Sequence, residues 1–177
     1  MGTLLKNTLR FVLLILVQVF VLDRIHLYYM VTPYIYFLFI LWMPFEGNRS
    51  VQMLIAFALG FTLDSFRHHP GFHASACVLI AYLRPFLINL LISQEGAENN
   101  YRAPSAKSLG GFIPYLVYAG MLTLVHHGWL FFLEAVQFGN FWYFIVKTVF
   151  STAISLLLII IVELLFSRKQ QFRTNTV

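Results

Sequence analysis

Charged residues are scarce in this sequence. Only 11% of its 177 residues are Asp, Glu, Lys or Arg, whereas 59% are hydrophobic and 18% are aromatic. A water-soluble domain usually has about 25% charged residues, so this chain has too few of them to cover a surface exposed to water. The polar residues also gather in short patches between long apolar runs. The sequence therefore predicts an all-α integral membrane protein embedded in a lipid bilayer.

Cysteine and catalytic motifs are also nearly absent. Cys77 is the one cysteine, which excludes an intramolecular disulfide. The chain contains no HExxH, no GxSxG and no Walker loop, and no two carboxylates are spaced for acid–base catalysis. We therefore expect a protein that is not an enzyme and that needs no cofactor. The net charge of +5 lies near the ends of the apolar runs, which is typical of a topology signal and does not predict nucleic-acid binding.

The apolar runs predict a single membrane domain, 1–177, with six transmembrane helices in a compact bundle. A helix needs about 20 residues to cross a bilayer, or fewer where its flanking side chains reach the interface. The first run is not followed by a cleavage site, so we expect a membrane span and not a removable signal. The expected spans are 9–22, 27–43, 51–66, 72–92, 109–133 and 141–166, followed by a basic tail at 167–177, with a polar loop at 93–108.

Lysine and arginine residues predict the orientation of these spans. With six spans, the head of the chain, the turn that contains Arg49, the loop 93–108 and the tail 167–177 all lie on one side, and they contain most of the basic residues. Because basic residues are concentrated on the cytoplasmic side of membranes, we expect both termini in the cytoplasm.

The chain is organised around the predicted third and fourth spans and the turn between them. Ala56, Gly60 and Asp64 are spaced by four and lie on one helix face, and Gly71 and Ser75 repeat that spacing on the next helix. Small residues let two helix backbones approach closely. Asp64 then has three interpretations: a bond to nearby backbone N–H groups, Arg67 or His68; a role in a relay or substrate site; or a contact with a partner protein.

The histidines of this turn, His68, His69 and His73, are candidates for a metal site. The turn Pro70-Gly71 separates them, and adjacent histidines point in different directions, whereas a structural zinc ion requires four ligands. We therefore expect no metal and a polar turn at the membrane interface. The pair His126-His127 is interpreted in the same way, as interfacial.

Three further charged residues lie within the predicted spans. Lys147 and Glu163 are expected to anchor the sixth span at the two interfaces. The alternative for both is buried pairing with another helix, and Lys147 with Asp64 is the pair to test. For Arg84, which precedes Pro85, we expect a helix kink and a contact with lipid headgroups, with a partner or lipid-phosphate site as the alternative.

The stretch from Gly60 to Ala76, GFTLDSFRHHPGFHASA, resembles the signature G-x-x-x-D…P-x-G-x-x-A of the rod shape-determining protein MreD family. Gly60, Asp64, Pro70, Gly71 and Ala74 match that signature. Thr32-Pro33 is similar to the proline that the family has at the start of its second span. The length of the chain and the six-helix plan also fit.

The resemblance implies a non-enzymatic scaffold of the bacterial cell-elongation machinery in the inner (cytoplasmic) membrane. Such a scaffold binds an MreC-like membrane protein, acts through it with MreB, RodA and a penicillin-binding transpeptidase, and helps to control lateral peptidoglycan synthesis and cell shape. The implied fold is similar to the substrate-binding subunits of energy-coupling-factor transporters. That similarity gives the alternative, a substrate-binding membrane subunit of a vitamin-type transporter. The intramembrane polar residues look scattered along the sequence, which favours the scaffold.

Overall fold

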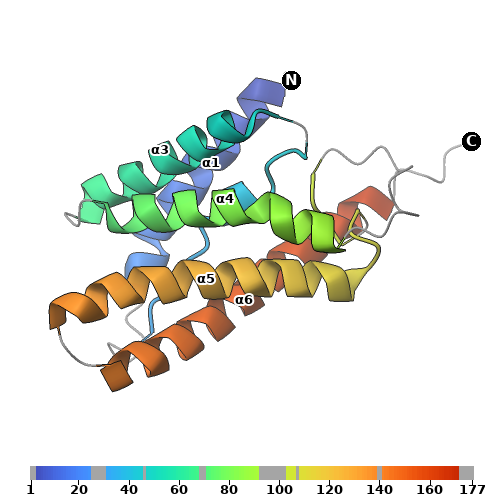
Figure 1. The fold of residues 1–177 in the computed structure, drawn as a ribbon. Helices are drawn as coiled ribbons and strands as arrows, with labels where there is room; N and C mark the ends of the chain where they lie inside the picture. Colours follow the sequence, from blue (N-terminus) through green and yellow to red (C-terminus); the bar gives the residue numbers. More distant parts are fainter. Residues whose placement is uncertain are drawn as a thin grey trace, which may run out of the picture.

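The computed structural model describes residues 3–24, 31–45, 47–67, 71–91, 103–106, 108–138 and 141–171. In this part of the chain the regular elements are helices (Figure 1), as expected for a helical membrane protein. They are α1 (Thr3–Phe20), the short 3-10 helix η1 (Leu22–Arg24), α2 (Leu38–Leu41), α3 (Arg49–Arg67), α4 (Phe72–Leu91), α5 (Phe112–Phe138) and α6 (Phe141–Gln171).

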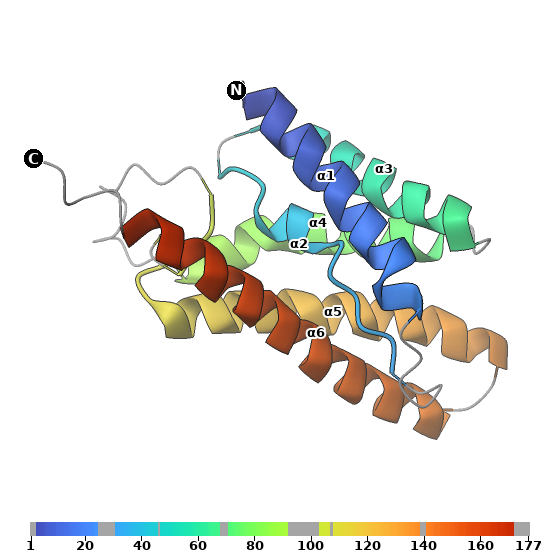
Figure 2. The ribbon, with the colours of Figure 1, turned by 180° about the vertical axis from the view of Figure 1, so that it is seen from behind.

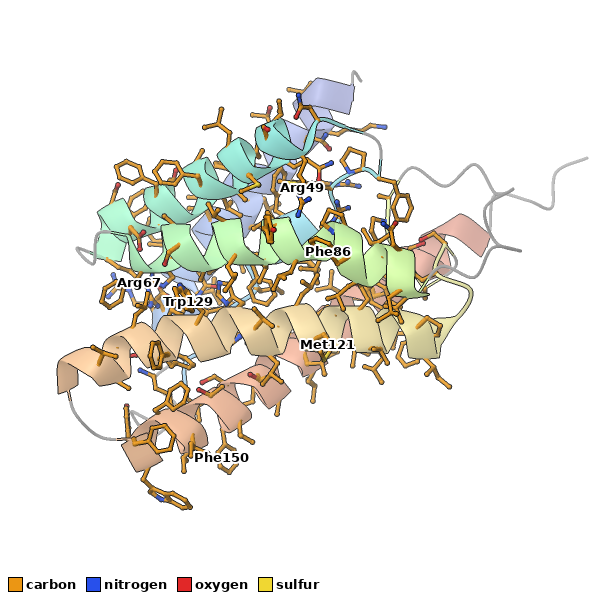
Figure 3. The ribbon with its side chains drawn as sticks, in the orientation of Figure 1. Arg49, Arg67, Phe86, Met121, Trp129 and Phe150 are labelled. Carbon is orange, nitrogen blue, oxygen red and sulfur yellow. The ribbon has the colours of Figure 1, made fainter. Side chains whose placement is uncertain are left out.

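Four stretches of the described chain are helical, long and apolar enough to cross a membrane: Leu5–Arg24, Phe72–Leu91, Phe112–Val136 and Phe141–Leu165. Helix α3 is 19 residues long but is less apolar, since it contains Gln52 and Asp64. Large apolar side chains point away from the bundle on every long helix, including Met121 and Phe150 (Figure 3). An outer surface of this kind suits contact with lipid.

The long helices pack in chain order. Helix α3 lies along α4, α4 along α5 and α5 along α6, and α1 covers the back of the molecule (Figures 1 and 2). Helix α3 ends and α4 begins at one end of the bundle, here called the hairpin end. Helices α1 and α3 begin at the opposite end, here called the N-terminal end, where α4 and α6 finish (Figure 2).

The expected second span, 27–43, is not a membrane-spanning helix. Residues 27–30 lie outside the described residues, 31–37 are not helical, and only Leu38–Leu41 form a short helix. This segment runs from the hairpin end between α1 and α6 to the middle of the bundle (Figure 2). Its side chains from Tyr34 to Leu38 are buried.

Because this segment is not helical, its backbone N–H and C=O groups lack the partners that a helix would provide. Side chains of the neighbouring helices bind these groups instead. Ser151 Oγ accepts from Thr32 N at 3.1 Å and Ser155 Oγ accepts from Tyr34 N at 2.9 Å. From α1, Gln18 Oε1 accepts from Ile35 N at 2.9 Å, and Gln18 Nε2 donates to Pro33 O at 3.2 Å. Because an unpaired backbone group away from water is costly, these three polar side chains make the irregular segment possible.

The other expected spans are helices with somewhat different ends. The first is longer at its start, since α1 begins at Thr3, and the fifth is shifted, since α5 runs from Phe112 to Phe138. The expected tail 167–177 begins inside α6, which continues to Gln171. Most of the expected loop 93–108 lies outside the described residues.

Candidate functional site

Asp64 connects the end of α3 to the start of α4. Its Oδ2 accepts hydrogen bonds from Gly71 N and Ala74 N, both at 3.0 Å, and its Oδ1 accepts from His73 N at 2.9 Å. The first N–H groups of a helix have no partner within the helix, and a carboxylate that accepts them also interacts favourably with the positive end of the helix dipole. The expected bond between Asp64 and backbone N–H groups is therefore present, with α4 as the donor.

Gly60 makes the close approach of these two helices possible. A Cβ atom at this position would lie 2.5 Å from Ala74 Cα and 2.5 Å from His73 O, well inside any normal contact distance. Gly71 has a φ of 92°, a backbone conformation that favours glycine. Four of the five residues that match the signature thus shape one hairpin, and Pro70 lies outside the described residues.

Arg67 does not bind Asp64 but binds Asp23 of η1. Its Nε donates to Asp23 Oδ2 at 2.8 Å, its Nη2 donates to Asp23 Oδ1, and its Nη1 donates to Tyr34 OH at 2.6 Å. Burial on its own lowers the pKa of Arg67, but Tyr34 and Asp23 outweigh burial, so the pKa lies above that of an ordinary guanidinium. Gln18 Nε2 also donates to Asp23 at 2.8 Å. The ion pair and its hydrogen bonds therefore connect α1, the non-helical segment and α3. Figure 3 labels Arg67 at the hairpin end.

His73 joins this ion pair to Asp64. Its Nδ1 lies 2.7 Å from Asp64 Oδ1, and its Nε2 lies 3.5 Å from Arg67 Nη1. Because the carboxylate can only accept and the guanidinium can only donate, this arrangement assigns a neutral ring with the proton on Nδ1. Asp23, Arg67, His73 and Asp64 thus form a continuous hydrogen-bonded chain, and Asp64 and His73 are each only 2% exposed.

The expectation that His126 and His127 are interfacial is wrong, because both side chains are fully buried. His126 Nε2 is 2.8 Å from Tyr36 OH, and its ring stacks on Phe37 with centroids 4.4 Å apart. His127 Nδ1 donates to Thr123 O at 2.9 Å, so its Nε2 accepts from Ser155 Oγ at 3.1 Å. The ring of Tyr34 contacts His73, His126 and His127.

The intramembrane polar residues therefore converge and are not scattered. The polar cluster, as we call it, combines residues from α1, the non-helical segment, α3, α4, α5 and α6; it consists of Gln18, Tyr34, Tyr36, Asp64, Arg67, His73, His126, His127 and Ser155. Sequence reasoning missed Gln18, Ser151 and Ser155 as members of this region. Two features of the sequence could have indicated them. Gln18 is a single amide side chain in an apolar run, and Ser151 and Ser155 are four residues apart, on one face of a helix.

Arg84 lies inside the bundle, not at the lipid headgroups. Its side chain is 1% exposed. Its guanidinium donates to Tyr118 OH at 3.0 Å, to Gln52 Oε1 at 3.2 Å, and to the carbonyl oxygens of Met43 and Pro44. All of these acceptors are neutral. Helix α4 continues past Pro85 to Leu91.

Lys147 pairs with another helix, as the alternative interpretation had it, but its partner is not the expected one. Lys147 Nζ lies 2.7 Å from both carboxylate oxygens of Glu134 at the end of α5, so it does not pair with Asp64. Glu163 is 4% exposed, and its Oε1 accepts from Ala106 N at 3.1 Å. Both side chains bind protein groups, in contrast to the expected interface anchoring.

Hollows on the surface of the described residues include a groove and a cavity. A groove of about 460 Å³ between α3, α4 and α5 is lined mainly by apolar side chains and by Gly71, Ala74 and Ser75. A second cavity, of about 480 Å³, lies between the first turns of α1 and α3. Neither hollow includes a histidine of the polar cluster. His68 and His69 lie outside the described residues, and within the described chain no group of three or more His, Cys, Asp or Glu could hold a metal ion.

No family model, no curated protein and no solved structure matches this chain. Four helices of the described chain are long and apolar enough to cross a membrane, as in helical membrane proteins.

Proposed function

We propose that this protein is a non-enzymatic scaffold of the bacterial cell-elongation machinery, similar to MreD. The observation that carries the proposal is the α3–α4 hairpin. Gly60 meets the backbone of Ala74, Asp64 accepts three N–H groups of the next helix turn, and Gly71 adopts a positive φ. These are four of the five residues of the signature, and their contacts give each of the four a physical reason to be that residue type.

The proposed topology has six crossings of the inner membrane, with both termini in the cytoplasm. Five crossings are long helices. The second is formed by the non-helical segment, which reaches the middle of the bundle, together with α2 and the residues that follow α2 toward the start of α3. A non-helical chain advances about 3.3 Å per residue, against about 1.5 Å in a helix, so a short segment can cover the distance. Irregular backbone is tolerated at membrane depth where protein surrounds it, and this segment is buried and bonded to Gln18, Ser151 and Ser155.

The proposed partner is a single-span, MreC-like protein, and the proposed binding surface is the groove between α3, α4 and α5. Two signature residues, Gly71 and Ala74, line this groove beside Ser75 and Val78. Such small residues at spacings of three and four allow another transmembrane helix to pack closely. Through this partner the protein would act with MreB, RodA and a penicillin-binding transpeptidase in lateral peptidoglycan synthesis.

The test is capture of the complex with a groove-filling variant and a matched control. We expect wild-type protein, extracted from its own membranes in mild detergent, to bring down an MreC-like protein that mass spectrometry identifies. Val78→Trp fills the groove and should reduce this yield at least fivefold. Leu90→Trp, on the same helix at a side chain 79% exposed, should not. Equal yields for the two variants would exclude the groove, and recovery without any cell-wall protein would exclude the scaffold.

The second candidate is a substrate-binding subunit of a vitamin-type transporter, in the manner of energy-coupling-factor transporters. The convergence of polar side chains in the polar cluster favours it, because ligand sites need several polar groups aimed at one place. Against it, most of these groups are bonded to one another. Co-purification of a transport ATPase or a vitamin-like molecule in the same experiment would establish this candidate in place of the scaffold.

A further inference from the structure

The cavity at the N-terminal end is lined by both polar and apolar residues. Polar side chains come from Asn7 and Arg10 on α1 and from Asn48, which precedes α3. We call these three residues the rim of the cavity. The apolar part of the lining includes Phe11, Phe39 and Ile55, which we call its floor.

The rim has an available positive charge. The guanidinium of Arg10 lies 5.7 Å from the centroid of the Trp42 ring, and no carboxylate of the described chain forms an ion pair with it. Tryptophan is enriched at the level of lipid headgroups, and a guanidinium over its ring is attracted to the face of the ring. An anion at this rim would therefore meet a guanidinium that already has a defined position.

A second positive charge lies behind the wall of the cavity. Three acceptor oxygens of wall residues, those of Met43, Pro44 and the Gln52 side chain, all bind the buried Arg84. These oxygens accept hydrogen bonds from the Arg84 guanidinium, which is not part of the cavity lining. Since Arg84 has only neutral acceptors within the described chain, its charge is not cancelled there, and an isolated buried cation is costly in a membrane. A negative charge in the cavity would lower that cost.

We propose that this cavity is a binding site for one anionic phospholipid. The phosphate lies at the rim, against Arg10 and the amides of Asn7 and Asn48. One acyl chain covers the floor formed by Phe11, Phe39 and Ile55. The occupant is a lipid and not a free phosphate because the cavity of about 480 Å³ is lined by the apolar floor as well as by the rim, and a water-soluble anion at the rim would leave the apolar part unfilled. The inference is independent of the partner proposed above.

Native mass spectrometry of the full-length protein in detergent tests the charge at the rim. Phosphatidylglycerol is titrated against wild-type protein, Arg10→Gln and the control Lys6→Gln, which removes the same charge from the same helix outside the cavity. One arginine near a membrane surface contributes about 1 kcal/mol to binding anionic lipid, so Arg10→Gln should weaken binding about fivefold. Lys6→Gln should leave it unchanged, and an equal effect of both variants would overturn the site.

A second pair of variants tests the apolar floor. Ile55→Trp fills the cavity and should abolish the bound lipid, whereas Leu54→Trp, a neighbour 67% exposed and outside the lining, should not. Glu46 lies between Pro44 and Gly47 of the lining in the sequence, but outside the described residues. Glu46→Gln removes a negative charge and should keep or strengthen lipid binding. Weaker binding would contradict the proposal. Phosphatidylcholine and glycerol phosphate serve as probes of each half of the ligand. Binding of either as tight as that of phosphatidylglycerol would overturn an anionic lipid site.

Discussion

Replacing Gly60 with alanine tests whether the contact between α3 and α4 is as close as the structure has it. The added Cβ would lie 2.5 Å from Ala74 Cα and from His73 O, and 2.6 Å from Ala74 N. Non-bonded carbon atoms are about 3.5–4.0 Å apart at their optimal separation, so the two helices would have to separate by about 1 Å. The atoms in the way belong to backbone, which cannot turn aside as the tip of a side chain can.

The cost of that movement can be estimated from its parts. Extra atoms in a well-packed core cost about 1–3 kcal/mol. The same shift stretches the bonds from His73 N and Ala74 N to Asp64, now 2.9 and 3.0 Å long, and bonds to a charged group contribute about 1.5–3 kcal/mol each. The better helix propensity of alanine returns up to about 1 kcal/mol. We expect Gly60→Ala to lower the free energy of unfolding by about 2–3 kcal/mol.

The measurement is unfolding of the purified protein in mixed micelles, followed by tryptophan fluorescence as a denaturing detergent is added. The same substitution at two glycines of α5 gives matched controls. A Cβ at Gly128 would meet nothing within 4 Å, and at Gly120 it would make an ordinary contact with Leu156 at 3.8 Å. Both controls should be as stable as the wild type or slightly more stable. If Gly60→Ala unfolds at the same concentration of denaturing detergent as the two controls, the close contact of α3 and α4 is refuted.

Two further substitutions test the polar contacts that hold the fold. Asp64→Asn keeps one acceptor oxygen but turns an NH₂ group toward the N–H donors that bind the second oxygen in the wild type. The free energy of unfolding should therefore fall by about 3 kcal/mol in the same assay. A stability within about 0.5 kcal/mol of wild type, the usual range of a neutral surface change, would contradict the capping role. Gln18→Leu leaves Ile35 N and Pro33 O without a side-chain partner and should cost about 2–4 kcal/mol; faster backbone amide exchange at Ile35 is the specific readout, and unchanged exchange would show that Gln18 does not hold the segment.

The α3–α4 hairpin could be predicted from the sequence because its interactions are local. Gly60, Asp64 and Ala74 are close in the chain, and their spacing alone places the small residues and the acid on one face. The structure adds that the acid caps α4 through backbone N–H groups. The long apolar helices could be predicted for a similar reason, since a bilayer imposes a length and an apolar composition on each of them.

The segment before Met43 is where sequence reasoning failed. Residues 27–43 are apolar and aromatic, which predicts a helix, yet the described part is mostly irregular backbone. What makes this possible lies far away in the chain: Ser151 and Ser155 accept its N–H groups from α6. The amino-acid composition of this segment does not indicate that serine hydroxyls of α6 will accept its backbone N–H groups. Only the tertiary structure therefore decides whether the segment is helical or irregular.

The charged and aromatic polar residues show the same division. Their presence inside apolar runs was evident from the sequence, and their cost in a membrane predicts that each has a partner. The choice of partner was not evident, because side chains from several helices meet only when the bundle forms. Arg67 binds Asp23, Lys147 binds Glu134, and Arg84 is buried against neutral oxygens. The sequence alone thus determined a helical membrane protein with a tight central hairpin. Tertiary packing decided which buried charges meet an opposite charge, as Lys147 meets Glu134, and which, like Arg84, bind neutral oxygens among the described residues.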